Sequence, residues 1–205
     1  MAIACDLVPI PPSFCLWQAY DPTAKADLCS SAILTPDGIF LVDPIPLADP
    51  PLADLLNGTS IAGILVTNAN HLRAAPQFGE RFSVPILAGA NSFPDQTRPG
   101  LRRVADGDKI SDELHVIGVD GAVAGEIALY HTPNGGTLIV GDALINFEPY
   151  GFTFLPRKYC SDEKGMRRSL RKLLDYKAAR MLFAHGTPIL SAASERLERL
   201  LNADL

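Results

Sequence analysis

One short apolar run that ends in polar side chains does most to limit how this 205-residue chain can fold. Residues 64–66 are Ile, Leu and Val, and the next seven positions hold Thr67, two asparagines, a histidine and an arginine. A short apolar run bounded by polar residues predicts a buried strand. We therefore expect a buried strand over residues 61–67, whose end brings amide, imidazole and guanidinium groups to one place just before a helix.

The remaining patterns predict alternating strands and helices. Apolar runs and turn residues predict strands over 14–20, 27–35, 39–42, 84–88, 114–119, 127–131, 137–142 and 181–184. Helices are predicted over 52–56, 74–82 and 193–201, and around the apolar stripe of Met166, Leu170, Leu173 and Leu174. The prolines at 44, 46, 50 and 51 predict an extended connection before the first helix, and residues 91–100 a loop. With no internal repeat and no linker, these elements indicate a single domain over residues 1–205 of mixed α and β structure.

Composition limits the class of protein. The formal net charge of −5 argues against general affinity for nucleic acid, and no apolar run approaches the length of a membrane span. The first residues lack the basic start of a signal peptide, so we expect a cytoplasmic protein. Its four cysteines have no metal-binding spacing and are expected to be small buried thiols.

Four of the predicted strands end directly on a polar residue. These residues are Asp43, Asn68, Asp142 and His185. If the four strands lie side by side and point the same way, their ends meet at one edge, which is where ligands collect in open α/β sheets. The alternative is that each residue only forms a turn or caps a helix, as Asp and Asn often do.

The ordered set of these segments resembles the metallo-β-lactamase superfamily. The resemblance covers residues 27–185. It rests on the hairpin that ends at Asp43, the strand that runs into Thr67, the segment from Gly125, the Gly141-Asp142 strand end and His185-Gly186. It implies an α/β fold of the four-layer αββα sandwich type, with two mixed sheets and helices outside. It also implies that Asp43 supports the metal ligands and that Asp142 and His185 are themselves ligands.

The chain departs from the family's metal-binding pattern at most of the other ligand positions. The family has Thr-His-x-His-x-Asp-His, whereas the corresponding ligand positions here hold Asn68, Asn70, Leu72 and Arg73. The histidine of the family's Gly-His-Thr-Pro-Gly segment corresponds to Ala122. Only two of seven usual ligands would remain, so a tightly held di-zinc centre is not expected, because catalytic zinc normally needs three protein ligands.

The residues around this former metal site allow several roles. His71 lies between two ligand positions. It is either a surface or capping residue, or a substitute ligand that completes a His-His-carboxylate set with Asp142 and His185. The two asparagines are suited to capping exposed backbone amides. Arg73 could pair with Asp142 and fill the vacated cation position.

Two further features have mainly structural interpretations. Residues 157–180 are rich in Lys and Arg, which indicates a solvated helix face, with attraction of an anionic partner as the alternative. His131 follows a strand into a Pro-Asn-Gly-Gly turn and is expected to be exposed.

These observations lead to two hypotheses about function. The first is a degenerate family member that needs no cofactor and binds or regulates an unknown small molecule or protein. The second is a metal-dependent hydrolase of ester or thioester type, with one zinc or other divalent ion on Asp142, His185 and His71. The second requires these three side chains to point at one another across about 4–5 Å. Neither hypothesis involves a membrane or nucleic acid.

Overall fold

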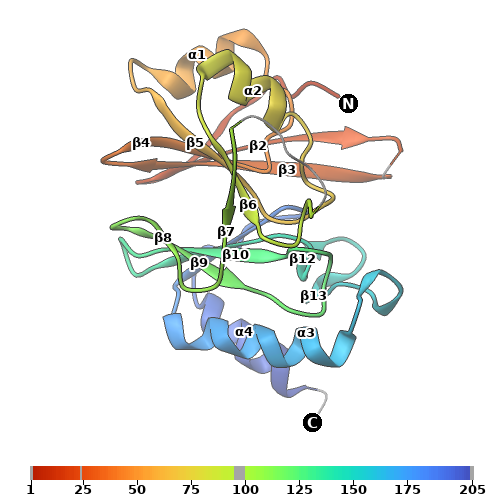
Figure 1. Ribbon diagram of the computed structural model, residues 1–205. Helices are drawn as coiled ribbons and strands as arrows, with labels where there is room; N and C mark the ends of the chain where they lie inside the picture. Colours follow the sequence, from red (N-terminus) through yellow and green to blue (C-terminus); the bar gives the residue numbers. More distant parts are fainter. Residues whose placement is uncertain (1, 24, 95–99, 204–205) are drawn as a thin grey trace.

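Two facing β-sheets with helices on both outer sides form the body of the protein (Figure 1). The structure, a computed structural model, describes residues 2–23, 25–94 and 100–203. Helices α1 and α2 cover the first sheet, and α3 and α4 cover the second (Figure 1). The predicted αββα sandwich of mixed α and β structure is confirmed.

The first sheet has seven strands that follow one another in chain order. They are β1 (Val8–Ile10), β2 (Phe14–Asp21), β3 (Ala26–Thr35), β4 (Gly38–Val42), β5 (Ile61–Val66), β6 (Ile86–Gly89) and β7 (Leu101–Val104). Strands β1 to β4 pair antiparallel, and β4 to β7 pair parallel. The predicted buried strand at residues 61–67 is therefore the fifth of seven strands, between two parallel neighbours.

The second sheet has five strands in the order β14-β11-β10-β9-β8. They are β8 (Lys109–Ser111), β9 (Leu114–Gly118), β10 (Ile127–His131), β11 (Thr137–Val140) and β14 (Arg180–Phe183). In the described part of this sheet, β11 and β14 pair parallel and the other neighbouring strands pair antiparallel. A separate hairpin, β12 (Leu144–Phe147) and β13 (Gly151–Phe154), follows β11 and forms a two-stranded sheet of its own.

Six helical segments complete the described chain. They are α1 (Asp49–Leu56), α2 (Ala75–Phe82), the short 3-10 helix η1 (Arg157–Tyr159), α3 (Glu163–Leu170), its 3-10 continuation η2 (Arg171–Tyr176) and α4 (Ala193–Asn202). Helix α1 begins three residues earlier than expected. The prediction that Pro50 and Pro51 belong to an extended connection was wrong, because the first turn of a helix needs no amide donor and accepts proline. Among the described residues, no helix is long and apolar enough to cross a membrane.

Three hydrophobic clusters fill the layers. One lies between the first sheet and α1 and α2, one between the second sheet and α3 and α4, and the third between the two sheets. Within β10 the third cluster takes Ile127 and Leu129, so the next residue on the same face is His131. The expectation that His131 is exposed was therefore wrong, since its side chain is completely buried.

The cysteines match their predicted structural role only in part. Cys29 is buried and Cys15 and Cys160 are partly buried, but Cys5 is exposed, contrary to expectation. Five strands were not predicted, namely β1, β7, β8, β12 and β13. Each has only three or four residues, which is too short for an alternating pattern to stand out.

Packing between the sheets can be tested at Ile33, which is fully buried in β3. We expect Ile33→Val to lower the free energy of unfolding by about 1 kcal/mol, because one buried methyl group is lost and the space is only partly refilled. Urea unfolding measures this change. The same substitution at Ile3, which is 62% exposed, is the matched control and should have almost no effect. Equal effects at the two positions would contradict the packing described here.

Candidate metal site

The four polar strand ends singled out in the sequence lie in one network, reached from both sheets. Strands β4 and β5 bring Asp43 and Asn68 from the first sheet, and β11 and β14 bring Asp142 and His185 from the second. The amide Nδ2 of Asn68 donates to Oδ2 of Asp142 at 3.2 Å. The strands were expected to lie side by side; they form instead two parallel pairs, one in each sheet.

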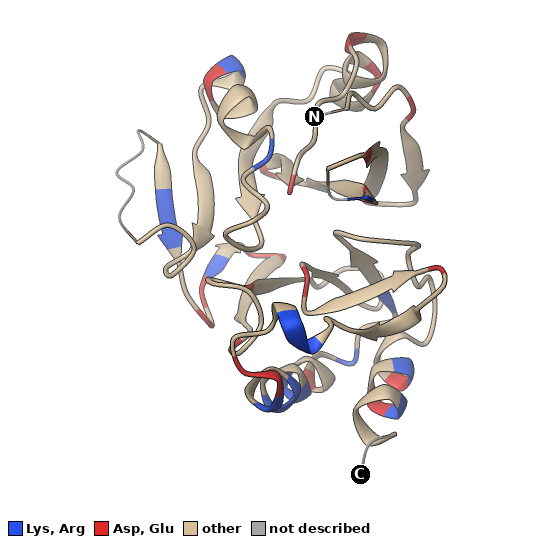
Figure 2. Cartoon of the chain, turned by 90° about the vertical axis from the view of Figure 1, so that its right-hand side faces the viewer, with Lys and Arg blue, Asp and Glu red and all other residues tan. Residues whose placement is uncertain are grey.

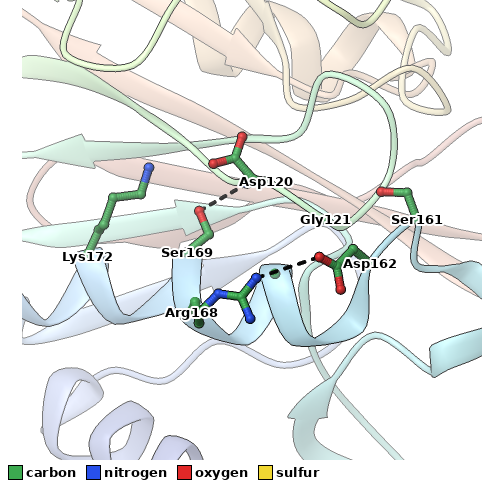
Figure 3. Close-up of a pocket in the computed structure, with 8 residues that line it drawn as sticks. Asp120, Gly121, Ser161, Asp162, Arg168, Ser169 and Lys172 are labelled. Carbon is green, nitrogen blue, oxygen red and sulfur yellow. Dashed lines mark hydrogen bonds and ion pairs between the residues drawn. The ribbon is translucent and has the colours of Figure 1, made fainter.

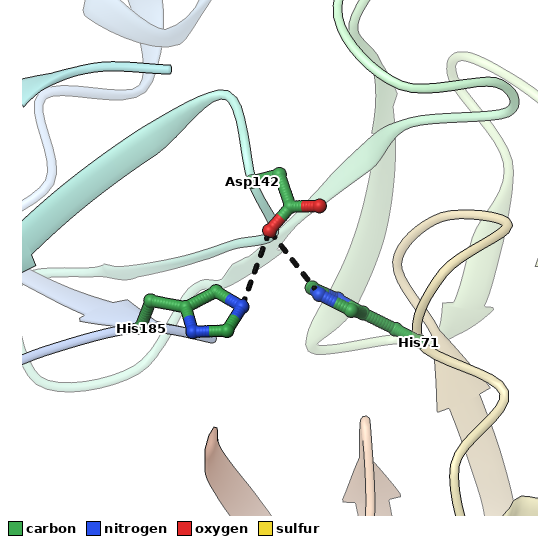
Figure 4. Close-up of side chains that lie close together, drawn as sticks. All are labelled: His71, Asp142 and His185. Atoms are coloured by element: carbon green, nitrogen blue, oxygen red, sulfur yellow. Dashed lines mark ion pairs between the residues drawn. The ribbon is translucent and has the colours of Figure 1, made fainter. Parts of the chain in front are cut away.

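His71, Asp142 and His185 converge at the centre of this network (Figure 4). Nε2 of His71 lies 3.2 Å from Oδ1 of Asp142, and Nε2 of His185 lies 3.3 Å from the same oxygen. The three potential ligand atoms lie within 4.8 Å of one another, and this is the one such group among the described residues. The side chains thus meet the geometric condition set for a substitute metal site. The alternative that His71 is a surface residue was wrong, since it is 3% exposed.

The other nitrogen of each imidazole ring is held by the protein. Nδ1 of His71 lies 2.8 Å from Oδ2 of Asp43, and Nδ1 of His185 lies 3.0 Å from the backbone oxygen of Asp27. Metal-binding histidines almost always donate this second N–H to a carboxylate or a carbonyl, which fixes the ring and leaves the opposite nitrogen for the metal. Both rings are therefore oriented with Nε2 toward Asp142.

Asp43 is the anchor of the loop that carries His71. Its buried carboxylate accepts hydrogen bonds from the backbone N–H of Thr67 at 2.8 Å and from the Thr67 hydroxyl at 2.5 Å, in addition to its contact with His71. Burial opposes ionisation of Asp43, but attraction to His71 and the hydrogen bonds outweigh it and lower the pKa of the carboxyl group. The ionised form of Asp43 is thus favoured, and it holds the His71 ring through Nδ1.

In the metal-free protein, His71 is protonated near neutral pH. Burial opposes the charge, but attraction to Asp43 and Asp142 is stronger and raises the pKa of His71 to about 9. Its charge in turn holds the pKa of Asp142 well below the usual range, against the opposing effect of burial. A metal ion would have to displace the proton from Nε2 of His71, so metal binding here competes with protonation.

Glu126 belongs to the same network and was not assigned a role from the sequence. Its Oε2 accepts a hydrogen bond from Nδ2 of Asn68 at 2.8 Å, and its Oε1 accepts one from the backbone N–H of Ala143 at 2.9 Å. Burial and the nearby charge of Asp142 raise the pKa of Glu126 to about 8. The sequence signal was weak, because a single Glu at the start of a strand resembles an ordinary surface residue.

The possible ion pair between Arg73 and Asp142 is not formed in the structure. The ion pairs of Asp142 among the described residues are with His71 and His185, so the cation position is taken by an imidazole. Nη1 of Arg73 donates instead to the backbone oxygens of Cys29 at 2.7 Å and Asp43 at 3.0 Å. Arg73 therefore ties its loop to β3 and to the end of β4.

The remaining two predicted pocket residues do not contribute side chains to this network. Asn70 is exposed, and only its backbone N–H takes part, donating to Oδ1 of Asn68 at 2.9 Å. That bond is the amide capping expected for the asparagines. Ala122 is packed into the hydrophobic cluster beneath α3.

A separate hollow lies on the outer side of the second sheet, beside α3 (Figure 3). It is lined by Asp120, Gly121, Ser161, Asp162, Gly165, Arg168, Ser169 and Lys172. Its two cations are already near carboxylates, Arg168 at 3.7 Å from Asp162 and Lys172 at 3.3 Å from Asp106. Basic positions outnumber acidic ones along this part of the chain, and both kinds lie on the outer helix (Figure 2). Both cations of the hollow are therefore already near a carboxylate, and the basic segment suits a solvated helix face.

Comparison with known proteins places the chain in a family. The family model described as the metallo-beta-lactamase superfamily matches residues 10–204. The chain belongs to the metallo-β-lactamase superfamily. No curated protein sequence matches it.

Solved structures of the metallo-β-lactamase superfamily share its fold at low sequence identity. TMB-1 is similar with a TM-score of 0.75 and 13% identity, over 100% of this chain and 99% of that one. DIM-1 metallo-beta-lactamase is similar with a TM-score of 0.74 and 15% identity, over 98% of both chains. An archaeal superfamily protein from Sulfolobus tokodaii is similar with a TM-score of 0.66 and 12% identity, over 86% of this chain and 79% of that one. These likenesses establish the shared fold.

Stability should depend on pH through His71 and Glu126 in the metal-free protein. Both hold a proton more tightly in the folded state, since their pKa values rise from 6.5 to about 9 and from 4.5 to about 8. The folded state therefore binds more protons than the unfolded state, and stability falls as pH rises. For His71 the stabilisation is complete below pH 6.5 and is lost toward pH 9; for Glu126 the fall begins near pH 4.5 and ends near 8.

Urea unfolding in a chelating buffer at a series of pH values measures this dependence. The denaturant midpoint should fall between pH 6.5 and 9. In the Glu126→Gln variant, which keeps the shape without the titration, the part of the fall that begins near pH 4.5 should disappear while the His71 part stays. A midpoint that does not change between pH 6.5 and 9 would show that His71 is not held as described.

Proposed function

We propose that this protein binds one divalent transition-metal ion through His71, Asp142 and His185 and hydrolyses a carbonyl substrate of ester or thioester type. The observation that carries the proposal is the meeting of two imidazole Nε2 atoms at one carboxylate oxygen, with both Nδ1 atoms anchored. Two imidazoles and a carboxylate suit several divalent metals, and three protein ligands with an open position are typical of catalytic rather than structural zinc.

A metal in this position supplies Lewis-acid activation of a carbonyl group and of water. The protein's own groups set up the site. Asp43 and the Asp27 carbonyl orient the two rings, and Asn68 binds Oδ2 of Asp142 so that Oδ1 faces the histidines. The side chain of His185 is 16% exposed, whereas that of His71 is 3% exposed. A substrate would therefore approach from the His185 side.

A specific observation also favours a second candidate, a metal-free protein that binds or regulates a small molecule or another protein. The ionised carboxylates of Asp43 and Asp142 are balanced by the protonated imidazole of His71 and by the nearby charge of Arg73, so these four groups carry no excess negative charge without a metal. Pairing and hydrogen bonds offset the cost of burying these charges, so a metal ion is not required to compensate them.

Elemental analysis and metal titration separate the two candidates. Protein purified without added metal and then dialysed against zinc, manganese or iron(II) should contain one ion per chain if the first candidate is correct. Hydrolysis of p-nitrophenyl acetate and of an acyl thioester should then depend on that ion and stop on chelation. Protein that takes up no ion at neutral pH would reject the metal site, and a bound ion without hydrolysis would reject the hydrolase.

A further inference from the structure

A second buried polar group lies at the other end of β11 from Asp142. His131, Thr137 and Arg180 are direct partners in the registers of β10 with β11 and of β11 with β14, so they form one row across three strands. Each is two residues along its strand from Leu129, Ile139 or Leu182, which belong to the core between the sheets. Because side chains two residues apart share a face, the row also points into that space. Thr137 and Asp142 are five residue steps apart along β11 and its end, or about 16 Å.

The side chains of this row are buried without enough partners. His131 and Thr137 are completely buried and Arg180 is 8% exposed. Nε and Nη2 of Arg180, the Thr137 hydroxyl and both ring nitrogens of His131 have no hydrogen-bond partner among the described residues. Arg180 donates only from Nη1, to the backbone oxygen of Pro11 at 3.0 Å. Such groups need an explanation, because nearly all buried polar atoms in proteins are hydrogen-bonded.

Among the described residues, the charge of Arg180 also has no counter-charge within ion-pair distance. Its guanidinium lies 5.5 Å from the ring centre of Phe14, and it forms no ion pair with any described residue. The carboxylate beside the row is Glu113, which lies 3.6 Å from Nε2 of His131 and is 34% exposed at the rim. An arginine cannot lose its proton in a protein, so a buried guanidinium needs an anion or several polar contacts.

The free atoms of Arg180 indicate which anion fits. Nε and Nη2 form one edge of the guanidinium, and two parallel N–H groups on one edge match the two oxygens of a carboxylate. The neighbouring Thr137 hydroxyl can donate a third hydrogen bond. We propose that the row of His131, Thr137 and Arg180 is a binding site for a small carboxylate, held by the Nε–Nη2 edge of Arg180 beneath the rim formed by Pro11 and Glu113.

Thermal unfolding of the intact chain in sodium formate and in sodium chloride of equal ionic strength tests this site. Formate should stabilise the wild-type protein more than chloride does, and the difference should saturate with concentration. Arg180→Lys keeps the charge but loses the two-pronged edge, and should weaken the apparent affinity for formate about tenfold. Arg81→Lys at an exposed ion pair is the matched control and should respond like the wild type.

A second variant and a second measurement cover the case in which Arg180→Lys does not fold. Thr137→Val keeps the shape, removes the hydroxyl and should weaken the formate effect by a smaller factor. In ¹H–¹⁵N spectra, the Nε–H signal of Arg180 should shift with formate and not with chloride. Equal effects of the two salts on the wild type would overturn the proposal, as would a wild-type response in Arg180→Lys. A crystal grown in formate that shows only water or the Glu113 carboxylate on that edge would do the same.

Discussion

Asp142→Asn should weaken the binding of a divalent metal at least about 100-fold while the protein stays folded. Oδ1 of Asp142 is the atom that both Nε2 atoms approach, at 3.2 and 3.3 Å. Asparagine has the same shape but no charge, so the site would keep two neutral imidazoles and lose its only anionic ligand. Calorimetric titration of the chelated protein with zinc at constant pH measures the change in affinity.

The control for this substitution is Asp162→Asn, at an exposed carboxylate that lies beside Arg168 of α3 and outside the His71, Asp142 and His185 group (Figure 3). It should bind zinc as the wild type does. If Asp142→Asn binds zinc within about threefold of the wild-type affinity, the metal is bound elsewhere. Circular dichroism and a urea midpoint for each variant distinguish a lost ligand from a lost fold.

Asp43→Ala should lower the free energy of unfolding by about 3–5 kcal/mol near neutral pH, because it removes one partner from a buried charge pair. The carboxylate accepts hydrogen bonds from the Thr67 amide and hydroxyl and pairs with His71 at 2.8 Å. Without it these donors are buried and unsatisfied, and the charge of His71 keeps only Asp142 as a partner. Urea unfolding at neutral pH in a chelating buffer measures the loss.

The matched substitution is Asp49→Ala, which removes an exposed carboxylate that pairs with Arg81 at 3.3 Å. Exposed pairs contribute about 0–1 kcal/mol, so this variant should stay close to the wild type. The outcome that contradicts the description of the network is a similar, small loss in both variants.

Much of the fold could be predicted because its strands carry strong local signals. The run from Ile61 to Val66 and the Pro36-Asp37-Gly38 turn are each defined by their own residues, and both are found in the structure. The short strands β1 and β7 were missed because they depend on pairing with neighbours, and three or four residues show little of that in a sequence. The start of α1 was predicted too late, because the proline at Pro50 is compatible both with an extended chain and with the first turn of a helix.

The candidate site was predictable only where a residue lies one or two positions after a strand. Asp43, Asn68, Asp142 and His185 could be found in this way, because the strand itself fixes their position. The direction in which a loop side chain points cannot be predicted from strand ends. His71 points inward and Asn70 outward, and Arg73 reaches backbone oxygens instead of Asp142. Glu126 and Arg180 were missed as buried polar groups because burial depends on which strand lies opposite.

The position of the three converging side chains has a mechanical consequence. His71 comes from the half of the chain that builds the first sheet, whereas Asp142 and His185 come from the half that builds the second. Whatever joins them, a proton or an ion, acts as a cross-link between the two halves, in addition to the hydrophobic core and the hydrogen bonds between them. The free energy of this cross-link adds to the free energy needed to separate the two halves. The protection of backbone amides against hydrogen exchange in β5 and in β11 should therefore change together when this cross-link is strengthened or weakened.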